Sequence, residues 1–221
     1  MMHTLLSGGY GGGSFLSFRK SLYLEVRKTQ SSLTGYFHEM FNRLSFFEKF
    51  LGTQSGAAVT ALKSNLGNHM RFLSESAPVI LYFIDTTESV LYTLEASDVG
   101  GNSVKKPIER QAWAYEYSLD HREDRVDINP DSLAAEASLL KGNFEKISEI
   151  LTDFNTMIEN VLSYTTIPWG EFSSIWSEAK HVCENIVTEM DKQINVLIEK
   201  TDVLIEEMVR VDHYLGNAME V

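Results

Sequence analysis

Apolar residues recur along most of this chain at steps of three and four residues, the spacing that places them on one face of a helix. The first two runs cover residues 15–51 and 58–94. Between them, Gly52 and Gly56 offer the backbone freedom that a tight turn needs. The pattern predicts two long amphipathic helices, the second of which we expect Pro78 to kink or split.

The second half of the chain repeats this pattern. Apolar positions alternate steps of four and three over 133–161, and a longer stripe covers 172–215. Because the turns are short, each pair of helices should be antiparallel. The sequence therefore predicts an all-α fold, an elongated bundle of two long antiparallel helical hairpins, 14–96 and 131–216, joined by an irregular connector, 97–130.

Two segments lie outside the helical pattern. Residues 1–13 include five glycines, and we expect a flexible tail there. Within the connector, the aromatic-rich stretch 108–119 is compatible with a short helix or with an extended clasp over the bundle. The helical domain is thus predicted to span 14–216.

Charge and composition exclude several classes of function. The chain carries 31 acidic and 19 basic residues, a formal charge of −12, and residues 131–221 hold 17 of the acids and six of the bases. Such a surface repels phosphate backbones, so we expect no nucleic-acid partner. The single cysteine, Cys183, cannot form an intramolecular disulfide or a cysteine-based metal site.

The distribution of apolar residues also bears on membranes and export. The longest uninterrupted apolar run, Val79 to Ile84, has six residues, far fewer than the roughly 20 that span a bilayer. The N-terminal residues lack the basic and apolar regions of a cleavable signal peptide. We therefore expect no stable membrane insertion, and any export would use a route without such a peptide.

One group of residues has a spacing typical of metal ligands. Glu178 and His181 are three residues apart, and Glu184 follows one turn later, as in four-helix di-iron proteins. Such a site needs a second Glu-x-x-His on another helix, which this sequence lacks. No nucleophile elbow or phosphate-binding loop is present either. We expect no metal, no cofactor, no catalytic residue and no enzymatic activity.

Two features of the second helix leave alternatives open. His69 occupies an apolar stripe, where an imidazole is either a hydrogen-bonded structural residue or a pH-sensitive packing switch. The run from Val79 to Ile84 covers every side of a helix, so it is either buried between the hairpins or presented to another protein.

At the level of motifs, the chain resembles the LXG domain, the N-terminal region of polymorphic toxins exported by type VII secretion systems of Gram-positive bacteria. The resemblance covers 14–216 and rests on a first helix ending in Phe50-Leu51-Gly52, on Gly56-Ala57-Ala58 with Ala61-Leu62-Lys63 and His69 after it, and on the pair of helices that begins near Asp131-Ser132-Leu133. The Leu-x-Gly triplet itself is not cleanly present. Trp169-Gly170 lies in the second turn, as in WXG-type hairpins, but without the intervening residue.

The resemblance implies an export module for interbacterial competition. In that family, small WXG-type helical helper proteins bind the LXG domain, and the complex is delivered to the membrane secretion ATPase. The chain would then be cytoplasmic before export and secreted afterwards, and a secreted toxin domain would follow Val221.

For the helper-binding surface we predict, on physical grounds, apolar residues of the first helix and residues around Pro78. They are Phe41, Leu44, Phe47, Phe50, Val79, Ile80, Phe83 and Ile84. Two other functions compete with export: a pore-forming helical toxin in which Val79 to Ile84 unfurls into a membrane, and a generic coiled-coil adaptor. A di-iron enzyme is the weakest alternative.

Overall fold

Four helices make up the part of the chain that this computed structural model describes, which is residues 22–52, 57–98, 130–163 and 169–219. Their bounds are α1, Leu22–Gly52; α2, Ala57–Asp98; α3, Pro130–Leu162; and α4, Phe172–Met219. No strand occurs among these residues. The prediction of an all-α helical bundle is confirmed. The predicted tail 1–13 and most of the predicted connector 97–130 lie outside the described residues.

Local sequence explains where two of the helices begin. Proline is suited to the first position of a helix, and an acid in the first turn is stabilised by the helix dipole, as Pro130 and Asp131 illustrate in α3. Before α4, Gly170 adopts a φ of 54°, a conformation that favours glycine. The backbone N–H of Phe172 then donates to the carbonyl of Trp169 (3.0 Å), which closes the turn.

The helix α2 continues through Pro78 without interruption. The alternative that Pro78 splits this helix is therefore wrong. A proline removes one backbone hydrogen bond, but Ala77 and Ile80 on either side of it are fully buried. Burial of this stretch keeps it helical despite the missing bond.

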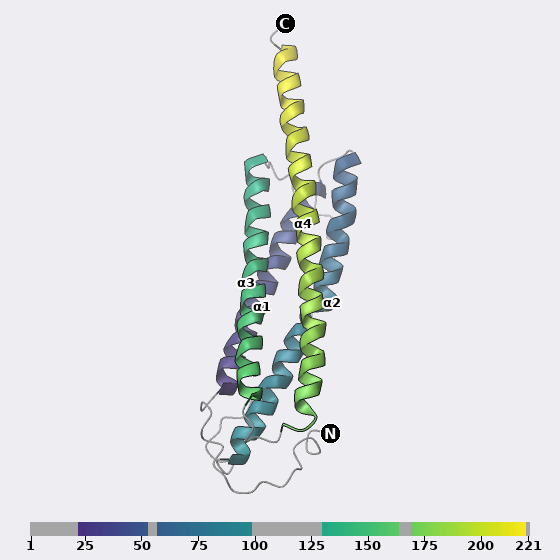
Figure 1. Cartoon of the computed structure of the whole chain (residues 1–221). Coiled ribbons are helices and arrows are strands. Elements are labelled where there is room, and N and C mark those ends of the chain that lie inside the picture. The colour runs from purple at the N-terminus through teal and green to yellow at the C-terminus, as the bar shows by residue number, and fades with distance from the viewer. Residues whose placement is uncertain (1–21, 53–56, 99–129, 164–168, 220–221) are drawn as a thin grey trace. The chain divides into compact units, whose positions relative to one another are not determined.

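The helices form two compact units, and every helix contributes a segment to each. Unit 1 contains residues 22–35, 77–98, 148–162 and 172–186, and unit 2 contains residues 36–52, 57–76, 130–147 and 187–219. Within each unit, α1 and α4 run in one direction and α2 and α3 in the other (Figure 1). The predicted antiparallel pairing within 14–96 and within 131–216 is thus found in both units.

The predicted stripes become the cores of these units. In α3, every position of the predicted stripe from Leu133 to Val161 is buried. In α4, most positions of the stripe from Phe172 through Leu204 are buried, with Ala179 and Ile186 partly exposed, but Val211 is half exposed. The sequence stripe of α4 is therefore longer than the stretch that its neighbours cover.

Unit 1 contains an ion pair in its interior. The Arg27 guanidinium of α1 donates through Nε to Oε1 of Glu88 in α2 (2.7 Å), and the Glu88 side chain is almost completely buried. Arg27 also lies over the ring of Tyr23, 5.8 Å from its centroid. A buried carboxylate without this partner would be strongly destabilising, so the pair fixes α1 against α2.

Unit 2 has a corresponding link between α1 and α3. The Arg43 guanidinium donates to Glu39 on its own helix (2.6 Å) and to Glu136 on α3 (2.8 Å). The hydrogen bond from Arg43 is the largest influence on the Glu39 carboxyl, and it holds the pKa of Glu39 below its ordinary value. The carboxylate form of Glu39 therefore favours the folded state at neutral pH.

The buried ion pair of unit 1 gives a first prediction. Replacing Arg27 with alanine removes the guanidinium that pairs with the buried Glu88 carboxylate, and we expect the free energy of unfolding to fall by about 3 kcal/mol. Urea denaturation followed by far-UV circular dichroism measures the change. The control is Arg71→Ala, which removes an exposed pair with Glu75 and should change stability by less than about 0.5 kcal/mol. Equal effects of the two substitutions would contradict the assignment.

Candidate partner-binding site

The structure buries seven of the eight residues predicted to bind a partner. Phe41, Leu44, Phe47 and Phe50 belong to the core of unit 2, and Ile80, Phe83 and Ile84 belong to the core of unit 1. Only Val79 is exposed. In this conformation, those seven side chains therefore pack in the cores and are not accessible to a partner. The amphipathic stripe alone does not show which of its residues the other helices cover.

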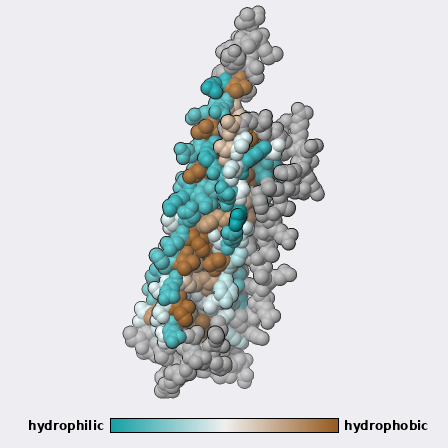
Figure 2. Space-filling view, turned by 90° about the vertical axis from the view of Figure 1, so that its right-hand side faces the viewer, coloured by the Kyte–Doolittle hydropathy of each residue, from teal (hydrophilic) through white to brown (hydrophobic). Residues whose placement is uncertain are grey.

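The apolar surface of unit 1 instead involves α2 and α4. Its large exposed apolar side chains are Val79 (44% exposed) and Tyr82 (75%) on α2, and Ile175 (50%) and Val182 (49%) on α4. We call these four residues the α2–α4 patch. Apolar residues gathered among hydrophilic ones are visible on the surface shown in Figure 2. Exposed apolar clusters of this kind are typical of protein interaction sites.

Aromatic packing joins the two helices that carry the patch. Phe83 on α2 and Trp176 on α4 have ring centroids 6.0 Å apart. Phe83 also meets Phe154 on α3 edge to face, at 5.6 Å and 90°. Tyr82 directly precedes Phe83, and Ile175 directly precedes Trp176. The buried rings therefore form a floor between the two helices that carry the patch.

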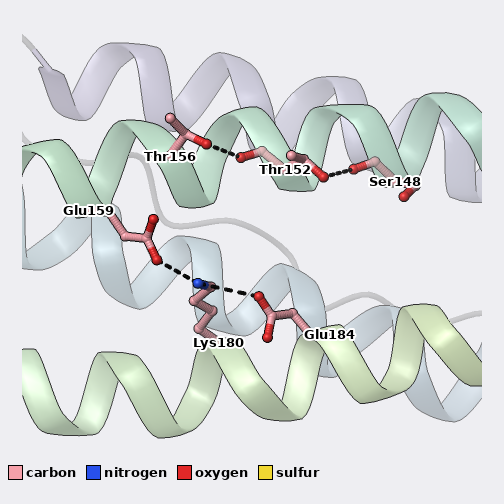
Figure 3. Close-up of polar contacts among 6 residues, drawn as sticks. All are labelled: Ser148, Thr152, Thr156, Glu159, Lys180 and Glu184. Carbon is pink, nitrogen blue, oxygen red and sulfur yellow. Dashed lines mark hydrogen bonds and ion pairs between the residues drawn. The ribbon is translucent and has the colours of Figure 1, made fainter.

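A charged cluster lies on the side of α4 that faces α3. The Lys180 ammonium bridges Glu159 of α3 and Glu184 of α4, 3.4 Å from the Glu184 carboxylate, as Figure 3 shows. The hydrogen bond to Glu159 raises the pKa of Lys180, and the ammonium lies 5.9 Å from the centroid of the Trp176 ring. On the α3 side of this cluster, the hydroxyls of Thr152 and Thr156 donate to backbone carbonyls one turn earlier (Figure 3). Trp176 thus contacts both the Lys180 ammonium and the Phe83 ring.

Sequence reasoning missed Tyr82, Ile175 and Val182. A signal for the α4 residues exists, since each of four exposed apolar side chains of α4 stands one position before a residue of the buried stripe. These side chains are spaced by seven residues or by twice seven: Ile175, Val182, Val196 and Val203. An apolar position beside each core position widens the apolar face of the helix beyond what one bundle covers.

The candidate metal ligands do not converge. Glu178, His181 and Glu184 are all exposed, and Glu184 is engaged with Lys180. Across the four described segments, no group of three or more His, Cys, Asp or Glu side chains is placed to hold a metal ion. The spacing of these residues thus reflects an exposed, charged helix face.

Cys183 lies in the core of unit 1. Burial, together with the nearby Glu184 carboxylate, raises the pKa of its thiol to about 12. The thiolate is the nucleophilic form of cysteine, so this side chain acts as a small apolar residue.

His69 lies in the core of unit 2 rather than near the patch. Its Nδ1 is 2.9 Å from Oε1 of Gln193 on α4. The imidazole therefore links α2 to α4, as a structural core histidine would.

None of the described helices combines the length and the apolar composition needed to cross a membrane. Comparison with known proteins finds no matching family model, no matching curated protein and no matching solved structure.

Substitutions at two adjacent residues of α2, Val79 and Ile80, test where the core of unit 1 ends. Ile80→Asp places a carboxylate in the core of unit 1 and should remove the cooperative unfolding transition, a loss above about 4 kcal/mol. Val79→Asp adds the same charge at an exposed position and should cost less than about 1 kcal/mol. Both are measured by urea denaturation. If Ile80→Asp were as stable as Val79→Asp, Ile80 would be a surface residue as the sequence analysis proposed.

Alkylation of the single cysteine tests the packing of α4. With a thiol pKa of about 12, Cys183 should react with iodoacetamide at least about 100-fold more slowly in the native protein than in denaturant near neutral pH. Mass spectrometry of timed samples measures the rates. A native rate close to that of a free thiol would show that this part of α4 is not packed as described.

Proposed function

We propose that this chain is an LXG-like export module that binds small helical WXG-type helper proteins, and that the α2–α4 patch is where a helper docks. The proposal rests on the resemblance of the sequence to LXG domains and on one structural observation. That observation is the exposure of four large apolar side chains on α2 and α4 of unit 1, Val79, Tyr82, Ile175 and Val182. Delivery to a type VII secretion ATPase and a toxin domain after Val221 belong to the same proposal.

The patch has the properties that a helical partner requires. Ile175 and Val182 are seven residues apart on α4, so they lie on the same helix face two turns from one another. Tyr82 adds a large side chain with a polar tip, a residue type enriched in interfaces. Because Phe83 and Trp176 are held by the core, binding would not require the surface to be ordered first, which lowers the entropic cost of association.

Charge favours a helper whose apolar stripe is flanked by basic residues. Exposed acidic residues near Ile175 and Val182 include Glu171, directly before α4, and Glu178 and Glu184 on α4. A basic partner would be attracted to this surface, whereas an acidic one would be repelled. The helper is therefore expected to carry Lys or Arg beside its contacting apolar residues.

The pore-forming alternative is disfavoured by contacts of α2. To unfurl, the stretch after Val79 would have to leave the core of unit 1, break the Arg27–Glu88 ion pair and separate Phe83 from Phe154 and Trp176. Glu88 would then enter the membrane without its cation, which is costly. No described contact favours this rearrangement.

Co-expression with any small WXG-type protein encoded beside this gene tests the proposal. We expect a stable complex in size-exclusion chromatography with light scattering, and at least about tenfold weaker binding by Ile175→Asp and by Val182→Asp. Each substitution puts a carboxylate into an apolar contact. Thr152→Asp, at an exposed position of α3, is the matched control and should bind normally.

Three outcomes would count against the proposal. The helper-binding function is wrong if no neighbouring WXG-type protein binds. The location is wrong if the two α4 variants bind as tightly as the control. A chain that forms a dimer through Ile175 and Val182 and binds no helper would assign the patch to self-association instead.

A further inference from the structure

Unit 2 holds an imidazole in an apolar interior. His69 on α2 is 9% exposed, and it borders a small cavity of about 20 Å³ that is partly open to the surface. Most of the lining is apolar and comes from α1, α2 and α4, including Met40, Leu44 and Met190. An ionisable group in such surroundings is stable only in its neutral form unless an opposite charge faces it.

The hydrogen bonds around Gln193 determine which imidazole nitrogen carries the proton. The Gln193 amide donates through Nε2 to Oε1 of Glu189 (3.3 Å), so its carbonyl oxygen is the atom that faces His69. An amide oxygen only accepts hydrogen bonds, and the His69 Nδ1 must therefore be the donor across the 2.9 Å contact. The neutral imidazole consequently has its lone pair at Nε2.

The Nε2 atom of His69 is buried and has no hydrogen-bond partner within the described part of the chain. A second proton would be added at this atom, and the new N–H would meet no described acceptor. Burial is the largest influence on the imidazole and lowers the pKa of His69, and the Gln193 hydrogen bond acts in the opposite direction. Two charged groups on α4 also act on the imidazole. Lys200 lowers the pKa of His69, and Glu189 raises it. On α1, the cavity residues Met40 and Leu44 carry no charge.

We propose that unit 2 is acid-sensitive, and that protonation of His69 at Nε2 weakens the packing of α2 against α4 around the cavity. The charged imidazole gains water and acceptors when these helices separate, so the proton favours the opened or unfolded state. This inference is independent of helper binding, because it concerns the core of unit 2 and not the α2–α4 patch.

The direction of the pH effect follows from the depressed pKa. Above the unfolded-state pKa of about 6.5, the imidazole is neutral in both states and the full stability is present. As the pH falls below that value, the unfolded state binds the proton first, and stability is lost until the folded-state pKa is reached. Mild acid therefore acts on this side chain before the carboxylates begin to titrate.

Urea unfolding of the full chain at about pH 7.5 and about pH 5.5 tests the proposal. The unfolding equilibrium constant should rise more in the wild type than in His69→Leu, by at most about tenfold, because the lower pH lies one unit below the unfolded-state pKa. Comparing each protein with itself at two pH values removes any general effect of the substitution on stability. His181→Gln, which changes an exposed histidine of α4, should respond to pH as the wild type does.

A second variant changes the partner instead of the histidine. Gln193→Glu places a carboxylate beside Nδ1, which should pair with the imidazolium and remove or reverse the loss of stability in acid. The proposal is overturned if His69→Leu retains the full pH response of the wild type. It is also overturned if Gln193→Glu loses stability in acid as steeply as the wild type, since the imidazole would then not be the group that responds.

Discussion

A long amphipathic helix cannot bury its own apolar stripe. Every turn adds apolar side chains to that stripe, and only other helices can cover them. In this protein, α2 and α4 have 42 and 48 residues, so covering their stripes dominates the energetics of folding. Four helices bring their stripes together in each unit, and the largest buried side chains include Phe37, Phe47 and Phe154. The remaining interactions, including the ion pairs of Arg27 and Arg43, orient helices that this burial already holds together.

The two proposals concern places where the burial of apolar residues and the exposure of polar ones are not complete. In unit 1, apolar side chains extend past the core onto the surface, where Ile175 and Val182 stand beside the buried Trp176 and Cys183. In unit 2, a polar side chain takes a core position, and His69 is tolerated there because the side-chain oxygen of Gln193 accepts a hydrogen bond from its one N–H. Exposed apolar side chains on the surface of unit 1 suggest a partner. A buried titratable side chain in unit 2 suggests a response to acid.

Periodicity was sufficient to predict the helices because a repeat of three and four residues has few other structural solutions. The buried stripe of α3 from Leu133 to Val161 was predicted at every position. The candidate site was harder, since Phe41 and Ile80 look the same in sequence whether another helix or a partner covers them. The interior pairing of Glu88 with Arg27 was also missed, because the two residues are 61 positions apart and no local pattern connects them. Which apolar residues are covered and which charged residues pair both depend on the neighbouring helices. The pattern of a single helix does not show which helices pack against it.

The central claim is that one boundary divides the apolar residues of α2 and α4 into a covered core and an uncovered patch. Hydroxyl-radical footprinting of the free chain, read out by mass spectrometry, tests it most directly because aromatic side chains of both kinds are adjacent in sequence. The account predicts strong labelling of Tyr82 and weak labelling of Phe83 and Trp176. Labelling of all three to a similar extent would contradict it, since the rings described as the floor of the patch would then be open to solvent.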